Sequence, residues 1–218
     1  MQAHESPQRV AVLGGGTMGC GISAGFLAHG CEVALLARDP ARFDAVRAAT
    51  LALAGDLGAS DADALLALQT MEGFDGWSRQ TLVIESVKED LALKQQVFAW
   101  LDARVPALVP IGSNSSSYGI SRIAEGLPTR RRMFGMHYFM PAHRVPLVEV
   151  VLGAESDAVL AQQVCAMFRA AGKKPVLVKR DIPGFLANRM QHALSREAFA
   201  LLDEGIASAE DIDAAVRF

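Results

Sequence analysis

The chain has 218 residues, of which 51% are hydrophobic and 21% are charged, and its formal net charge is −3. This composition is that of a globular protein with one sizeable core and part of a second unit. The small negative charge gives no reason to expect a nucleic-acid or anionic-membrane partner. No segment approaches the roughly 18 uninterrupted apolar residues that a membrane helix needs, so we expect no membrane association.

The three cysteines, Cys20, Cys31 and Cys165, are odd in number and widely spaced. This pattern fits neither a disulfide framework nor a zinc site, so we predict no metal and a reducing, cytoplasmic location. The polar N-terminal stretch MQAHESPQR lacks the apolar region of a secretory signal, and we expect none.

Short apolar runs alternate with helical patterns over most of the chain. Strands are predicted at residues 9–13, 32–37, 81–87, 108–112, 132–139, 147–152 and 174–179. Helices are predicted at residues 17–29, 40–69 with a break near 55–60, 91–101, from 119, and 157–171, the last with Val159, Leu160, Val164, Met167, Phe168 and Ala171 on one face. Strands that alternate with helices predict a Rossmann-type α/β fold with a doubly wound, mostly parallel sheet.

The pattern changes at the segment DIPGFLANRM, residues 181–190. Pro183 and Gly184 interrupt the chain there, and only helical patterns follow. One helix is predicted after Ser208, with Asp211 three residues on as a variant of the capping box. We therefore expect a sheet domain over residues 1–182. Residues 183–218 are expected to be the beginning of an all-helical C-terminal domain, which is truncated here.

The segment VLGGGTMGCG contains the spacing Gly14-x-Gly16-x-x-Gly19. It follows a predicted strand and begins a predicted helix within a strand–helix–strand unit, which is the context that this motif needs to bind a dinucleotide. Gly14 permits a tight turn, Gly16 lets the backbone approach a pyrophosphate, and Gly19 lets helix and strand pack closely. The alternative is a glycine turn without a ligand. In this context we favour an NAD(P)-binding domain.

Four stretches resemble the 3-hydroxyacyl-CoA dehydrogenase superfamily: GGGTMGCGI, ESVKEDLALK, SNSSS followed by GMHYFMP and PLVEV, and DIPGFLANRM. The resemblance extends along the whole chain. It implies an NAD(P)-dependent oxidoreductase that acts on a 3-hydroxy or 3-keto acid derivative. It also implies that a helical domain, through which the protein usually forms a homodimer, follows the sheet domain.

The resemblance implies three catalytic residues. The histidine of the family's H-[FY]-F motif is the general acid/base and the acid of LVE is its partner; here they are His137 and Glu149. Ser116 matches the serine that hydrogen-bonds the substrate oxygen. An imidazole, whose ordinary pKa is near 6.5, can take the hydroxyl proton as hydride leaves the carbon, and a carboxylate fixes its tautomer. The alternative for His137 is a core histidine bonded to a backbone carbonyl. The alternative for Ser116 is a residue of a polar loop that caps the helix from 119.

Several further residues match the family's cofactor site. Glu89 and Lys94 match residues near the cofactor ribose and nicotinamide, although without the resemblance both read as a solvated helix face. His143 is expected at the surface or at a pocket rim, and residues 130–132 on a solvated face. The predicted cofactor-binding residues are Gly14, Gly16, Thr17, Met18, Gly19, Arg38, Glu89, Lys94 and Asn114.

The end of the second predicted strand bears on the choice of dinucleotide. NAD-specific domains place a carboxylate there to accept the ribose hydroxyls, and this chain has Ala37, followed by Arg38 and Asp39. Arg38 has the charge to bind a 2′-phosphate. Alternatively, Arg38 points to solvent and Asp39 reaches the ribose. The family favours NAD, and we hold acceptance of NADP at least as well as NAD as a hypothesis.

Two departures from the family bear on the substrate. Met140 stands where the family's H-F-F-N-P motif has an asparagine that contacts substrate or nicotinamide. Residues 48–78 contain no Lys or Arg but five acids, which would repel rather than pair with the phosphates of CoA. Both departures favour the members of the family that act on small free acids, such as L-gulonate and carnitine dehydrogenases.

The sequence therefore predicts hydride transfer between NAD(P) and a small hydroxy acid or a related carbonyl compound. The same chemistry on 3-hydroxyacyl-CoA, for example 3-hydroxybutyryl-CoA, is the first alternative. A dinucleotide-binding protein without turnover is the second. Ser116, His137 and Glu149 argue against the second alternative, because binding alone does not need them.

Overall fold

The computed structural model describes residues 8–218, and the N-terminal stretch for which we expect no secretory signal begins outside the described residues. The chain forms two compact units, one up to Pro183 and one over Gly184–Phe218.

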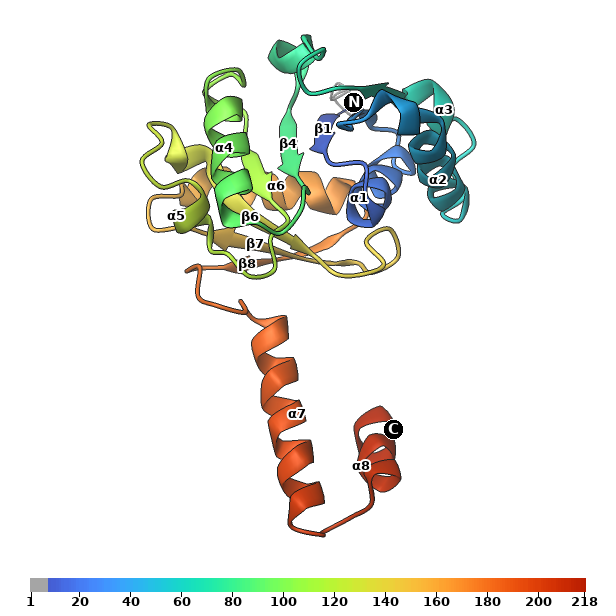
Figure 1. The fold of residues 1–218 in the computed structure, drawn as a ribbon, viewed down its shortest axis with the longest axis vertical. Helices are drawn as coiled ribbons and strands as arrows, with labels where there is room; N and C mark the ends of the chain where they lie inside the picture. Colours follow the sequence, from blue (N-terminus) through green and yellow to red (C-terminus); the bar gives the residue numbers. More distant parts are fainter. Residues whose placement is uncertain (1–7) are drawn as a thin grey trace, which may run out of the picture. The chain divides into compact units, whose positions relative to one another are not determined.

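The first unit is built on a single eight-stranded sheet with the order β3-β2-β1-β4-β5-β6-β7-β8 (Figure 1). Among the described strands, β6 and β7 pair antiparallel and the other neighbours pair in parallel. The strands are β1 (Arg9–Leu13), β2 (Glu32–Leu36), β3 (Leu66–Gln69), β4 (Leu82–Glu85), β5 (Ile111–Ser113), β6 (Met133–Tyr138), β7 (Leu147–Leu152) and β8 (Lys174–Val178). The prediction of a Rossmann-type α/β fold is confirmed.

Helices cover both faces of this sheet. Residues of α1 (Thr17–Leu27), α2 (Phe43–Gly55), α3 (Ala62–Leu65) and α6 (Ala158–Ala170) form one hydrophobic core, and residues of α4 (Leu91–Asp102) and α5 (Ile120–Ile123) form a second. Three short 3₁₀ helices are η1 (Pro40–Arg42), η2 (Gly76–Arg79) and η3 (Arg130–Arg132). Alternate strand residues point to opposite cores: Val10 and Val12 contact the first, and Ala11 and Leu13 the second. Burial on both faces explains why the strands read as continuous apolar runs.

The structure corrects the sequence prediction at several places. The strand predicted at residues 108–112 begins only at Ile111, and Leu108 is 88% exposed. Residues 66–69 form β3, an edge strand parallel to β2, where the alanine- and leucine-rich pattern predicts helix. Pairing along Val33–Leu36 overrides the helical propensity of this short segment. In α6, Val159 is 72% exposed although the pattern places it on the buried face, and Ala161 is buried instead.

The second unit consists of α7 (Ala187–Asp203) and α8 (Ala209–Arg217). Ser208 caps α8, since its hydroxyl accepts from the backbone N–H of Asp211 at 3.1 Å. Neither helix contains a buried residue among those described. Their exposed apolar side chains are Met190, Leu194, Phe199, Leu202 and Val216.

Candidate functional site

The glycine loop connects the carboxyl end of β1 to α1, beside the point where the strand order reverses between β1 and β4. Gly14 has a φ of +114°, and a Cβ there would collide with the carbonyl of Ser86. A Cβ on Gly19 would collide with the carbonyl of Gly14. At Gly16, in contrast, a Cβ would meet no described atom within 4 Å. Two glycines are therefore needed by the fold, and the third leaves open space at the helix N-terminus.

The start of α1 suits an anion. No described side chain caps the helix at Gly16, and its first turn contains no acidic residue. Gly16 and Thr17 are exposed, while Met18 packs partly against the core. Backbone N–H groups at such an end, with the helix dipole behind them, bind pyrophosphate. The loop thus fits the diphosphate of a dinucleotide.

The turn after β2 has the sequence Ala37-Arg38-Asp39. Ala37 is buried, and Arg38 and Asp39 are exposed. The Asp39 carboxylate accepts from the backbone N–H of Ala41 at 3.0 Å and caps η1. The acid of this turn, Asp39, is therefore engaged in a helix cap, and Arg38 is exposed beside it.

His137 and Glu149 occupy directly opposed positions on β6 and β7. The His137 Nδ1 atom lies 2.8 Å from Glu149 Oε2, and the two side chains are 4% and 0% exposed. A carboxylate at Nδ1 makes that nitrogen the N–H donor, which leaves Nε2 as the basic nitrogen of a neutral ring. The pair has the arrangement of a general acid/base and its orienting carboxylate.

Asn114, directly after β5, connects the ends of three strands. Its Oδ1 accepts from the backbone N–H of Tyr138 at 2.9 Å, and its Nδ2 donates to Ser86 Oγ at 3.2 Å. Its backbone N–H donates to the carbonyl of Glu85 at 2.8 Å. Both side-chain ends of Asn114 are used within the protein, next to the glycine loop on one side and His137 on the other.

The serine loop after β5 is held by one carboxylate. Glu89 Oε1 accepts from Ser115 Oγ at 2.6 Å and from the backbone N–H groups of Ser116 and Ser117 at 3.2 and 3.0 Å. Ser116 itself is exposed, so its hydroxyl can face a ligand. Burial opposes ionisation of Glu89, but the hydrogen bond from Ser115 and the charge of Lys94 outweigh burial and lower the pKa of Glu89.

Behind this loop lies a buried ionic cluster. Lys94 is 1% exposed, and its Nζ lies 2.8 Å from Glu85 Oε1 and 3.2 Å from Glu89 Oε2. The other Glu85 oxygen accepts from Ser113 Oγ at 2.6 Å. Lys94 is therefore no part of a solvated helix face. Glu85 and Ser113 are not predicted as site residues from the sequence. The signal for Glu85 is an acid within the otherwise apolar run TLVIESV.

Two other expectations are corrected. Arg132 is 3% exposed, because its guanidinium donates to the carbonyls of Val105 and Val109 and pairs with Asp102. It closes the end of α4 rather than lying on a solvated face. His143 is buried, with 9% of its surface exposed, so it does not lie at the open surface.

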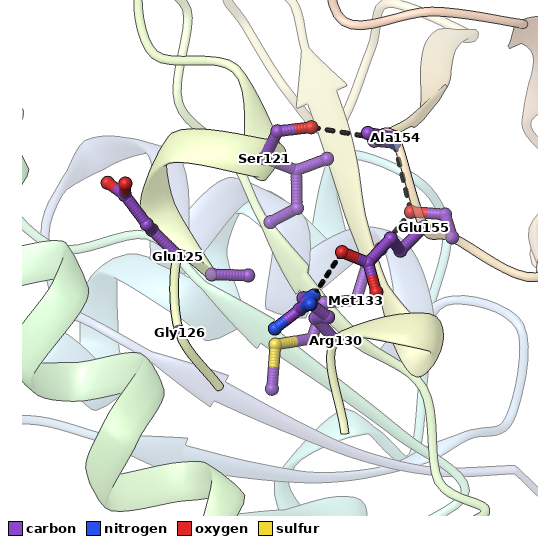
Figure 2. A pocket seen from close by; sticks show the side chains of 11 residues that line it. Ser121, Glu125, Gly126, Arg130, Met133, Ala154 and Glu155 are labelled. Carbon is purple, nitrogen blue, oxygen red and sulfur yellow. Dashed lines mark hydrogen bonds and ion pairs between the residues drawn. The ribbon is translucent and has the colours of Figure 1, made fainter. Parts of the chain in front are cut away.

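A cavity of about 360 Å³ lies away from these residues (Figure 2). Its walls come from α5, the start of β6 and the turn after β7. Figure 2 shows Arg130 and Glu155 facing each other within it, 2.6 Å apart, and Ser121 Oγ bonded to the N–H of Ala154. The cavity lies at the opposite end of the β6–β7 pair from Tyr138, and the predicted catalytic residues are not among its lining.

The described part of the chain contains no helix long and apolar enough to cross a membrane. Nor do the described residues place three or more His, Cys, Asp or Glu side chains together where they could hold a metal ion.

A Rossmann-type sheet with a dinucleotide loop and a buried histidine–carboxylate pair defines the class of NAD-dependent dehydrogenases. Residues 9–182 match the profile "3-hydroxyacyl-CoA dehydrogenase, NAD binding domain", and residues 184–218 match "3-hydroxyacyl-CoA dehydrogenase, C-terminal domain". The chain therefore belongs to the 3-hydroxyacyl-CoA dehydrogenase family, as its motifs predict.

Named relatives agree with this assignment. L-carnitine dehydrogenase of Streptomyces griseus is 36% identical over 98% of this chain and 65% of its own length. The 5-formyl-3-hydroxy-2-methylpyridine 4-carboxylate 5-dehydrogenase of Mesorhizobium japonicum is 31% identical over 97% of this chain and 70% of its own length. The crystal structure of Escherichia coli 3-hydroxybutyryl-CoA dehydrogenase superposes with a TM-score of 0.87 at 32% identity, covering 98% of this chain and 46% of that one. The chain thus spans about two thirds of the length of the two curated relatives.

Proposed function

We propose that this protein transfers hydride between a nicotinamide dinucleotide and the hydroxyl-bearing carbon of a small 3-hydroxy acid. His137 is the general acid/base, Glu149 orients it, and Ser116 binds the substrate oxygen. The observation that carries the proposal is the 2.8 Å contact between His137 Nδ1 and Glu149 Oε2 inside two buried strands. A buried ionisable pair of this kind adds little stability over apolar residues, so its presence argues for chemistry.

The protein's own residues have distinct tasks in this reaction. A bound oxidised dinucleotide supplies the hydride acceptor. His137 Nε2 removes the hydroxyl proton as the carbon loses hydride, and Glu149 stabilises the imidazolium that forms. Glu89 fixes the loop that carries Ser116, so the serine hydroxyl has a constant position beside the substrate oxygen. The residues proposed to hold the dinucleotide are Gly14, Gly16, Thr17, Met18, Gly19, Arg38, Glu89, Lys94 and Asn114.

In this assignment Glu89 and Lys94 act in different ways. Glu89 is 38% exposed and faces both the serine loop and solvent, so it can also reach a ligand. Lys94 is 1% exposed and lies between two carboxylates. Its contribution to the cofactor site is therefore to hold Glu89 and the serine loop in place.

A free acid is the proposed substrate rather than a CoA thioester. Residues 48–78 form α2, α3 and β3, and the arginine just before them, Arg47, is already paired with Asp63. Asp56 is paired with Arg144. Residues 48–78 themselves contain no Lys or Arg, so this stretch offers no cation to the phosphates of CoA. The similarity to L-carnitine dehydrogenase, whose named substrate is a small hydroxy acid, supports the same choice.

3-Hydroxyacyl-CoA remains the second candidate, because the chain is 35% identical to Escherichia coli 3-hydroxyadipyl-CoA dehydrogenase. Reduction of NAD is measured with L-carnitine, 3-hydroxybutyrate and 3-hydroxybutyryl-CoA under identical conditions. We expect a higher kcat/KM for a free acid. A clear preference for the thioester would reverse the ranking, and binding of NADH without turnover of any hydroxy compound would favour a non-catalytic dinucleotide-binding protein.

The proposal for the cofactor is that NADP(H) is accepted at least as well as NAD(H). It rests on Ala37 in place of a carboxylate, on the engagement of Asp39 in a helix cap, and on the exposed Arg38. A guanidinium binds a 2′-phosphate through charge-assisted hydrogen bonds of about 1.5–3 kcal/mol.

The second unit, which matches the family's C-terminal domain, is proposed to belong to a homodimer interface. Its apolar side chains, which include Met190, Phe199 and Val216, are exposed in the described structure. Exposed apolar groups in this number are typical of a surface that a partner covers. A cytoplasmic location is proposed on the same basis as in the sequence, from three unpaired cysteines.

A further inference from the structure

Lys173 lies in the turn between α6 and β8, and its backbone is fixed by the end of the helix. Gly172 adopts a φ of +72° and terminates the helix, and the Lys173 N–H donates to the carbonyl of Phe168 at 2.9 Å. The residue is 8% exposed, whereas its neighbour Lys174 is exposed. A lysine is rarely buried without partners for its ammonium group.

Those partners are three backbone carbonyls of one short segment. Lys173 Nζ donates to the carbonyl oxygens of Ala142 at 2.5 Å, Val145 at 3.0 Å and His143 at 3.4 Å. Burial lowers the pKa of Lys173 to about 8, so at pH 7 the group is mostly an ammonium. An ammonium has three N–H donors, which matches the three carbonyls. The side chain also packs near α1, since a Cβ on Gly25 would lie 3.6 Å from the lysine Cε, an ordinary van der Waals distance.

The segment that Lys173 holds is the connection between β6 and β7. It leaves β6 after Tyr138 and enters β7 at Leu147, two residues before Glu149. The N–H groups of Arg144 and Val145 both donate to the carbonyl of Pro141 at 3.0 Å, which makes a tight turn. The connection therefore joins the strand of the proposed general base to the strand of its carboxylate.

Lys173 also touches the end of β6 directly. Its Nζ lies 5.7 Å from the ring centroid of Tyr138, the residue after His137. Without the ammonium, the carbonyls of Ala142 and His143 would lose a charged donor in a buried place, at the cost of an unsatisfied polar group. Opening of the turn would then become more favourable, because the carbonyls could hydrogen-bond to water.

We propose that Lys173 is a positioning residue, which fixes the turn of residues 140–146 through three carbonyls and so holds His137 against Glu149. The consequence for catalysis rests on the function proposed above, but the effect on the turn does not. Lys173 itself touches neither substrate nor cofactor in this proposal.

The test compares Lys173→Met with Lys174→Met, the same change one residue further on at an exposed position. Hydrogen–deuterium exchange is followed at pH 7 for peptides that cover residues 139–147. We expect Lys173→Met to speed exchange there by about tenfold or more, the ratio expected for loss of a charge-assisted hydrogen bond. Lys174→Met should leave it unchanged. Equal exchange in both variants and the wild type would overturn the proposal.

A second readout separates positioning from a general loss of stability. The His137 Nδ1 proton, shared with Glu149, should give a downfield NMR signal that is protected from solvent exchange. We expect Lys173→Met to broaden or shift this signal, while a variant that is merely less stable keeps it below its melting temperature. An unchanged signal in the folded variant would also overturn the proposal.

Kinetics provide the third readout. Lys173→Met should lower kcat by roughly tenfold to a hundredfold and leave the Kd for NADH within about twofold, since a small misplacement of a catalytic group is costly. An unaltered kcat together with faster exchange in the turn would contradict the claim that Lys173 positions His137 for catalysis.

Two further outcomes are distinguishable. If the wild type has no turnover, the proposed function fails while the exchange result still decides the role of Lys173. If Lys173→Met does not fold, Lys173→Gln, which also removes the charge, is measured in the same way, and unchanged exchange and NMR signal there count against the proposal.

Discussion

The imidazole of His137 and the carboxylate of Glu149 meet at 2.8 Å because their residues are directly opposed across the antiparallel pair β6–β7. Side chains alternate between the two faces of a strand, so a shift of one residue in register would place Glu149 on the face opposite to His137. The contact is therefore a property of the register, and whatever fixes the register also fixes the proposed catalytic pair.

The first prediction concerns Glu149→Gln. The amide has nearly the shape of the carboxylate but cannot stabilise an imidazolium, so turnover should fall by less than removal of the histidine costs, with the largest loss near neutral pH. kcat between pH 6 and pH 9 measures the effect. A kcat of Glu149→Gln equal to that of the wild type over the whole range would show that the carboxylate does not assist the imidazole.

The glycine loop yields a second prediction, from a matched pair of variants. Gly16→Ala adds a methyl group to open space, so the melting temperature should hold while dinucleotide affinity falls. Gly19→Ala places its methyl group against the carbonyl of Gly14, so the fold itself should be destabilised. Thermal melting and NADH titration distinguish the two. Full NADH affinity in Gly16→Ala would mean that the pyrophosphate does not approach this backbone.

The third prediction is that Arg38→Ala weakens NADPH binding by about tenfold or more and changes NADH binding little. Loss of a charge-assisted hydrogen bond to the 2′-phosphate gives the direction and the size. Dissociation constants of both reduced cofactors for the wild type and the variant provide the measurement. NADH binding tenfold tighter than NADPH, unaffected by the substitution, would contradict the proposed use of NADP.

The fourth prediction concerns pH and Glu89. Because the folded protein lowers the pKa of this carboxyl below 4.5, its stabilising effect is complete above that value and is lost as the pH falls through the folded pKa. The melting temperature of Glu89→Gln should therefore lie below that of the wild type at pH 7, and the gap should narrow below pH 4.5. A gap that stays constant on acidification would show that the carboxylate charge does not stabilise the serine loop.

Much of the fold can be predicted from the sequence because most strands are apolar runs that are buried in the sheet. The pattern predicts β7 over residues 147–152, and the strand has those bounds. A short continuous apolar run flanked by turns is typical of a buried strand, which leaves few other structures for these residues. The edge strand β3 escapes this reasoning, because LALQ pairs with β2 only in the folded chain and has helical propensity in isolation.

The candidate site was predictable where a motif fixes the geometry and unpredictable where distant charges meet. The spacing of the glycines predicts the loop, and the antiparallel pairing of two motif-bearing strands brings His137 to Glu149. The burial of Lys94, Arg132 and Lys173 depends on contacts with Glu85, Val105 and Ala142, which lie 9, 27 and 31 residues away in the sequence. A single charged residue in a predicted helix or turn does not indicate such partners, and charged side chains are usually exposed.

The most direct test of the account is the substitution His137→Asn, with His29→Asn at an exposed position after α1 as its control. We predict that His137→Asn lowers kcat by roughly 10²–10⁴, the usual contribution of a general base, and leaves the Kd for the dinucleotide nearly unchanged. His29→Asn should retain the wild-type kcat. Full turnover in His137→Asn would contradict the central claim that this imidazole moves the proton.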